Sequence, residues 1–218
     1  MKKGIKTLAV VLLAFLLILA SLAVWQRENI KIFLVSINHS AQTIDAMVLE
    51  NEQQINRILN ELADGNMHAL SDDEIERLLS GELSEEEAIK IIMNKTDDSS
   101  QSDSKIDNII SRMFLLRAEY VKRLTTLENK AKSNAKEVFR QKTSVSEKLA
   151  FIEKYTTIGV NLEKECDARM KSLVRELETE LETLGKDTAV ISEVREYYKI
   201  EKKLKKSQLL SKYSKYLK

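Results

Sequence analysis

The chain begins with an uncharged apolar run that suits the interior of a bilayer far better than water. Residues 7–25 read TLAVVLLAFLLILASLAVW, and the basic segment 1–6 precedes them. As a helix the run would be roughly 28 Å long, close to the hydrocarbon thickness of a membrane. Trp25 stands where an interfacial aromatic residue is expected, and Arg27 follows it. The run predicts a membrane-targeting helix.

This helix is either a retained anchor or a cleaved signal. Residues 21–23 read SLA, the small-x-small pattern that signal peptidase recognises. The length of the run, and the absence of Gly or Pro before that site, favour a single-pass signal-anchor. The positive-inside rule places the N-terminus in the cytoplasm and residues 26–218 outside. A chain cleaved near Ala23 would instead be secreted, with its body on the same side.

Composition favours helices for the rest of the 218 residues, because the chain has no proline and only 5 glycines. Hydrophobic residues make up 43%, enough for a buried core. We predict an all-α chain in which the N-terminal helix continues into a coiled-coil-like stalk. The expected segments are a basic flank (1–6), the membrane helix (7–25), the stalk (26–64), an acidic helical hairpin (65–95), a flexible linker (96–105) and an elongated antiparallel three-helix bundle (106–218).

The stalk carries a seven-residue apolar repeat. With Ile30 at a d position, the a and d residues are Ile30, Leu34, Ile37, Ala41, Ile44, Val48, Asn51, Ile55, Ile58 and Leu62. Isoleucine at d favours bundles of three or more helices over a two-stranded zipper. Asn51 would cost stability in this seam and could fix its register, which makes it a candidate register or oligomer residue. The seam packs either on the chain's own later helices or on a second copy.

Short sequence motifs mark the predicted ends of helices in the hairpin and the bundle. Serines with a glutamate three residues later predict capping boxes at Ser71, Ser84 and Ser144, and Gly81 is placed to end the first short helix. The run LLSGELSEEEAIKII (78–92) resembles the SHOCT-type short helical-hairpin domains of bacterial proteins. The resemblance implies a two-helix turn, and we take no function from it.

Three apolar stripes predict the long helices of the bundle. The β-branched residues and glycine at 156–160 lower helix propensity, so we expect a bend there. Leu184-Gly185-Lys186-Asp187 reads as a helix stop followed by a new N-cap. The stripe residues are Ile106, Ile109, Met113, Leu116, Tyr120, Leu124, Leu127, Ala131, Ala135 and Val138; then Leu149, Ile152, Tyr155, Leu162, Cys166, Met170, Leu173, Leu177, Leu181 and Leu184; then Val190, Ile191, Val194, Tyr197, Tyr198, Leu204, Leu209, Leu210, Tyr213 and Leu217.

Charge is segregated although the net charge is only +1. Residues 45–107 hold 17 acidic and 5 basic side chains, whereas residues 199–218 hold 8 lysines and one glutamate. The basic tail could bind anionic lipid headgroups or an anionic polymer, meet the chain's own acidic segment, or simply be a solvated helix face. Nucleic acid is disfavoured, since the body lies outside the cytoplasm. The candidate partner-binding residues are Lys202, Lys203, Lys205, Lys206, Lys212, Tyr213, Lys215 and Tyr216.

The sequence offers little for catalysis, so we expect no enzyme, cofactor or metal site. The five glycines are too scattered for a phosphate-binding loop, and the two histidines lie far in sequence from Cys166. Cys166 falls on an apolar stripe and reads as a small core residue; the alternative is an intermolecular disulfide.

These features predict a membrane-anchored extracytoplasmic protein that acts as a scaffold, a spacer or a partner-binding module. The expected contacts are the membrane, through residues 7–25, and a protein partner or second copy, through helical faces. The alternatives are a sensory or regulatory ectodomain that signals through a membrane partner, and a secreted helical protein.

Overall fold

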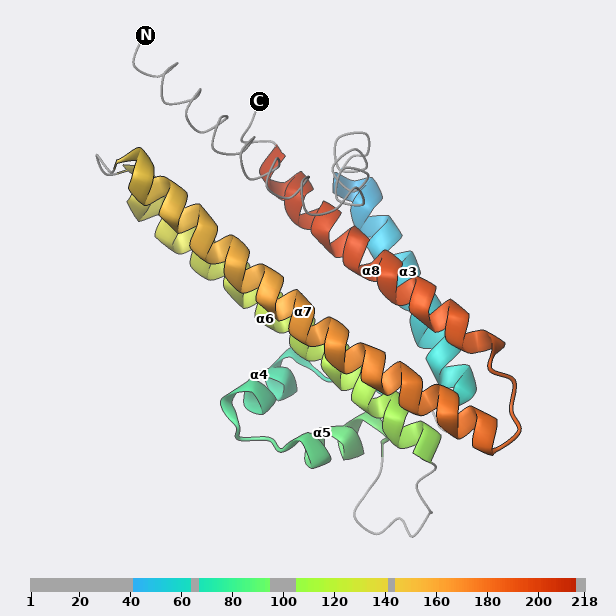
Figure 1. Cartoon of the computed structure of the whole chain (residues 1–218). Coiled ribbons are helices and arrows are strands. Elements are labelled where there is room, and N and C mark those ends of the chain that lie inside the picture. Colours follow the sequence, from blue (N-terminus) through green and yellow to red (C-terminus); the bar gives the residue numbers. More distant parts are fainter. Residues whose placement is uncertain (1–40, 64–66, 95–104, 141–143, 215–218) are drawn as a thin grey trace. The chain divides into compact units, whose positions relative to one another are not determined.

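Helices are the only regular secondary structure in the described part of the protein. The computed structural model describes residues 41–63, 67–94, 105–140 and 144–214; the predicted membrane run, the first part of the stalk and almost all of the linker lie outside them. None of the described helices combines the length and hydropathy of a membrane span. The all-α prediction is confirmed for these ranges, which contain no strand. The helices are α3 (Ala41–Leu62), α4 (Asp72–Ser80), α5 (Glu85–Ile92), α6 (Lys105–Arg140), α7 (Val145–Thr183) and α8 (Ala189–Ser214) (Figure 1).

The chain divides into two compact units. One holds residues 41–55 of α3 with 196–214 of α8, and the other holds residues 56–195. The sequence predicts one bundle over 106–218, whereas the structure groups most of α8 with α3. The physical reason is that the apolar stripe of α8 has a partner in the stalk seam, where Leu204 packs with Ile44 and Val48. The seam prediction is confirmed from position 44 to 58, since Ile44, Val48, Asn51, Ile55 and Ile58 are buried.

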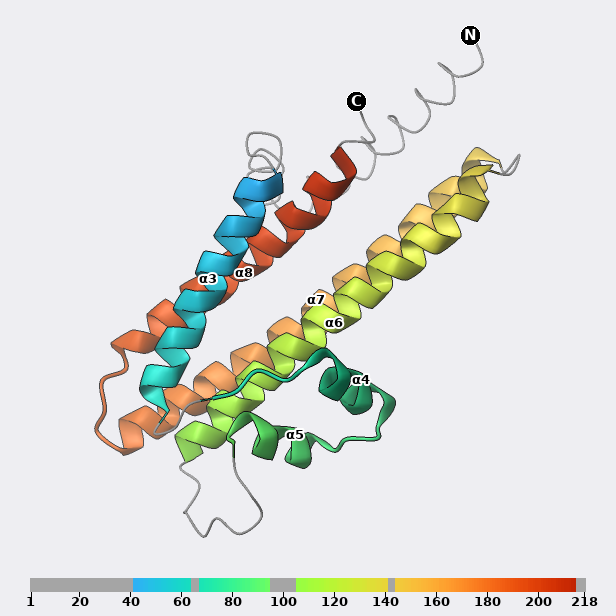
Figure 2. The same cartoon turned by 180° about the vertical axis from the view of Figure 1, so that it is seen from behind.

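In the second unit α6 and α7 form a long antiparallel hairpin. The two helices lie side by side along their lengths in both views (Figures 1 and 2). Ion pairs join the two helices, and their residue numbers decrease along α7 as they increase along α6. This order is expected for antiparallel helices. These pairs are Lys105–Glu180, Arg112–Glu176, Glu119–Arg169 and Arg123–Glu165.

Burial falls along this hairpin from its open end to its turn. Near the open end α4 and α5 pack on α6 (Figure 2), and there α6 is buried on more than its predicted stripe: Ile110, Phe114 and Leu115 are buried as well. Beyond Tyr120 the stripe residues of α6 are only half-buried. On α7, Leu149 keeps 39% of its surface exposed, although it lies on the same predicted stripe as fully buried Leu177.

All three capping boxes are confirmed. In each, the N-cap serine hydroxyl accepts the N–H of the glutamate three residues on, and that glutamate accepts the serine N–H. Gly81 ends α4 with φ of 82°, a left-handed conformation that glycine adopts without strain. At the other predicted junction α7 ends at Thr183, and the Asp187 carboxylate accepts the Ala189 N–H at the start of α8.

The capping boxes predict a loss of helix stability in acid. The N–H of the N-cap serine, and then its hydroxyl, lower the pKa of Glu74 and of Glu87; in the third box the Ser144 hydroxyl, and then its N–H, lower the pKa of Glu147. The pKa of each of these glutamates is lower in the folded state than in the unfolded state. The stabilisation is therefore present above the ordinary glutamate pKa of 4.5, and it is lost as the pH falls through the pKa of the folded state.

The measurement is the thermal midpoint of the full chain in detergent, followed by circular dichroism between about pH 6 and pH 3. The variant Glu74→Gln/Glu87→Gln/Glu147→Gln should lose less stability over this range than the wild type, since an amide keeps an acceptor but does not titrate. A matched variant at three other exposed glutamates, Glu85→Gln/Glu86→Gln/Glu153→Gln, should follow the wild type. Superimposable profiles for the wild type and the capping-box variant would contradict the prediction.

Helix α7 continues without interruption through residues 156–160, where a bend is expected from the sequence. A Cβ atom added at Gly159 would lie 3.7 Å from Leu127 Cδ2, an ordinary van der Waals contact. We therefore expect Gly159→Ala to stabilise the hairpin by about 0.5–1 kcal/mol, because alanine loses less backbone entropy in a helix. Thermal unfolding measures this, with Gly81→Ala as the control: it should destabilise, because Gly81 has a positive φ. A lower midpoint for Gly159→Ala would show that the two helices are closer than this contact allows.

Candidate interaction surfaces

Asn51 lies on α3 and contacts α8 of the same chain. Its side chain is buried, and its Nδ2 atom donates to the backbone carbonyl of Tyr197 on α8 at 3.3 Å. The predicted seam residues on either side, Val48 and Ile55, are buried too. The described contact of Asn51 is therefore with α8 of its own chain, and a role in oligomer register stays a prediction.

Replacing Asn51 with leucine should stabilise the protein by about 1 kcal/mol. The Tyr197 carbonyl lies inside α8, where the helix itself provides a donor, so losing the long amide contact leaves no unsatisfied acceptor. Leucine adds apolar burial at a position that is only 6% exposed. Thermal unfolding of Asn51→Leu tests this against Asn51→Asp, which buries a charge and should destabilise. A loss of stability in the leucine variant would assign the amide a net stabilising role.

The first half of the basic tail lies against α3. The side chains of Lys202, Lys203, Lys205 and Lys206 are all half-buried. Lys205 Nζ lies 2.8 Å from Glu52 Oε1, and with 15% of its side chain exposed it is not a solvated surface lysine. Nearby, Lys202 Nζ lies 5.3 Å from the centre of the Tyr198 ring.

The second half of the tail is described only in part. Helix α8 runs through Lys212 and Tyr213, whose side chains lie outside the described part, as do Lys215 and Tyr216 altogether. The structure thus brings Lys205, a predicted tail residue, to an acidic partner on α3, which is one of the alternatives for the tail left open by the sequence.

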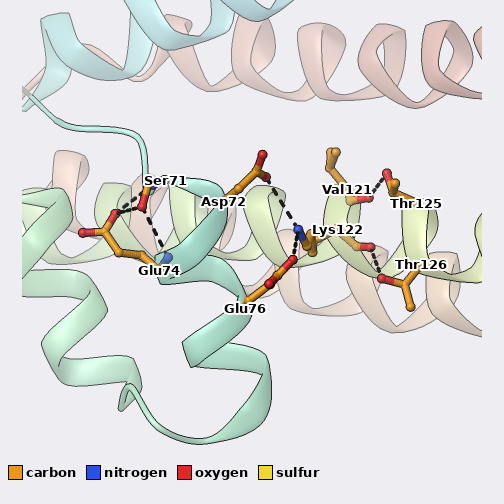
Figure 3. Close-up of polar contacts among 8 residues, drawn as sticks. All are labelled: Ser71, Asp72, Glu74, Glu76, Val121, Lys122, Thr125 and Thr126. Atoms are coloured by element: carbon orange, nitrogen blue, oxygen red, sulfur yellow. Dashed lines mark hydrogen bonds and ion pairs between the residues drawn. The ribbon is translucent and has the colours of Figure 1, made fainter.

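The acidic hairpin is tied to α6 by a lysine that sequence analysis does not single out. Lys122 Nζ lies 2.6 Å from Glu76 Oε1 and 3.7 Å from Asp72 Oδ1 (Figure 3). The bond to Glu76, with the nearby negative charges, raises the pKa of Lys122. The acidic run at 72–76 predicts an ion pair with a basic side chain, but the sequence does not indicate which lysine or arginine forms it.

Cys166 is buried on the α7 stripe. No cluster of three or more His, Cys, Asp or Glu side chains in the described ranges is arranged to hold a metal ion. No protein-family model, no curated protein and no solved structure matches this chain.

Proposed function

We propose that this chain is a membrane-anchored, extracytoplasmic helical protein that acts by contact, as a scaffold, a spacer or a partner-binding module, without catalysis. The observation that carries the proposal is the uncharged run 7–25 behind its basic flank. In this proposal the chain leaves the membrane at Trp25 and reaches α3 through a helical stalk over residues 26–40.

In this proposal the contact surface includes the half of the α6–α7 hairpin near its turn. Two large apolar side chains are exposed there, Leu149 at 39% and Ile158 at 42%. A protein partner or a second copy on these helical faces is part of the proposal.

Alkaline carbonate extraction of membranes from cells that express the full chain tests the anchor. We expect the protein in the membrane pellet, with its N-terminal residues 1–6 intact by mass spectrometry. External protease should digest the body of the chain in cells whose outer barrier has been opened, because residues 26–218 are proposed to face outward.

Two outcomes would overturn parts of the proposal. A soluble product that begins near Val24 would replace the anchor with a cleaved signal and leave a secreted protein. Full-length chain in the cytosolic fraction would overturn both the membrane anchor and the cleaved signal.

A further inference from the structure

Helix α4 is held less firmly than its neighbour α5. Of its 9 residues Ile75 is buried, whereas the shorter α5 buries Ala88, Ile89 and Ile92. In the second half of α4, Leu79 keeps 38% of its surface exposed. Burial of apolar side chains is the main force that holds a short helix on its neighbours, so α4 should leave α6 more easily than α5 does.

Both ends of α4 are satisfied by residues next to them in the chain. The capping box of Ser71 and Glu74 closes the first turn, and the Gly81 N–H donates to the Leu78 carbonyl at the last turn. A Cβ atom added at Gly81 would meet nothing within 4 Å, so the chain has room at this turn. These hydrogen bonds are kept when α4 moves away from α6.

The segment before α4 is fastened to other elements. The Met67 N–H donates to Asn60 Oδ1 at 3.0 Å, and the His68 N–H donates to the Ile92 carbonyl at the end of α5 at 2.7 Å. Leu70 is buried. With this segment on one side and α5 on the other, movement is confined to α4 and its two turns.

One face of α6 lies between two contacts with these residues. Ser111 Oγ lies 3.3 Å from Met67 Sδ, and further along α6 Lys122 Nζ contacts two carboxylates of α4 (Figure 3). Leu115 and Ala118 stand between Ser111 and Lys122 at spacings of three and four residues, which place all four on one face of the helix. Leu115 is only 1% exposed.

We propose that α4 is a lid on this face of α6, and that the stretch from Leu115 to Lys122 binds an acidic amphipathic helix of a partner protein when the lid opens. The present occupant defines the chemistry that fits. In α4 an apolar residue, Ile75, stands beside Asp72 and Glu76, the two carboxylates that meet Lys122.

A partner helix with the same pattern would compete with α4, and its apparent affinity would be set by the fraction of chains in which the lid is open. The inference goes beyond the proposed function, because it holds with or without the membrane anchor.

Hydrogen exchange of the full chain in detergent tests the lid. Amides 76–80 of α4 should exchange on the order of 10-fold faster than amides 89–92 of α5, because α4 opens while α5 stays in place. The lid variant Ile75→Ala/Glu76→Gln should speed exchange in α4 further and leave α5 unchanged.

Binding is tested with a fluorescent peptide of residues 70–83, whose anisotropy reports the complex. The lid variant keeps Lys122 and should bind this peptide on the order of 10-fold more tightly than the wild type, because its own α4 competes less. The matched control on the same helix is Asp73→Asn/Leu79→Ala. It should bind within about threefold of the wild type, because Leu79 is already partly exposed.

A double-mutant cycle locates the bound peptide. In the lid variant, a further Lys122→Gln should weaken binding of the peptide by about fivefold. The same substitution should have little effect on a peptide with Asp72→Asn and Glu76→Gln, which lacks the carboxylates that meet the lysine. Lys130→Gln, at an exposed position further along α6, should leave both peptides unaffected.

Each failure has its own signature. Equal exchange rates in α4 and α5 would overturn the lid. Fast exchange in α4 without tighter binding by the lid variant, or binding that does not depend on Lys122, would overturn the binding face. Wild-type dimers that the peptide dissociates, seen by light scattering, would assign the face to α4 of a second copy and overturn the partner protein. None of these results bears on the membrane anchor.

Discussion

Replacing Leu177 with alanine should lower the free energy of unfolding of the α6–α7 hairpin by about 3 kcal/mol. Leu177 is fully buried near the open end of the hairpin, where α4 and α5 also pack on α6. Removing a buried leucine loses its transfer free energy and leaves a cavity that close-packed neighbours fill only in part.

The same substitution at Leu149 is the matched control. Both leucines lie on α7 and on one predicted stripe, but Leu149 is 39% exposed, so Leu149→Ala should cost less than about 1 kcal/mol. Urea unfolding of the full chain in detergent, followed by helical circular dichroism, measures both. Similar losses at the two positions would contradict the fall in burial along the hairpin.

The second large effect is expected in the proposed anchor. Leu13→Arg with Leu17→Arg places two charges near the centre of the run 7–25, each at an insertion cost of about 2.5–3.5 kcal/mol. The total is comparable to the gain from inserting the whole run, so the chain should leave the carbonate-resistant fraction. Leu13→Phe with Leu17→Phe, which keeps the run apolar, should stay in the membrane pellet. If the arginine variant also stays there, residues 7–25 are not the element that holds the chain.

Structural features that depend only on residues a few positions apart, such as helix caps, can be predicted from the sequence. A serine and a glutamate three residues apart satisfy each other's backbone groups wherever they stand, so Ser71, Ser84 and Ser144 could be placed as caps. Apolar periodicity likewise identifies the inward face of a helix. Ile44 and Val48 are therefore buried as expected.

The choice of partner could not be predicted in the same way. A stripe says which face of α8 is apolar, but not that Leu204 on this face packs with Ile44 and Val48 of α3. Ile110 and Leu115 are buried although they lie outside the predicted stripe of α6, a helix that also packs against α4 and α5.

Within the candidate surfaces, the pairs of Lys205 with Glu52 and of Lys122 with Glu76 depend on register between helices. The chain has 35 basic and 34 acidic residues, so composition alone leaves very many pairings open.

The pairing of α3 with α8 also affects how the protein is made. Asn51 and Tyr197 are 146 positions apart, so the stalk seam is synthesised long before its partner leaves the ribosome. Contacts this distant slow folding, and the nascent chain exposes the seam in the meantime. A chaperone that shields helical apolar faces should therefore be needed until the last segment arrives, and products of premature termination should be degraded quickly.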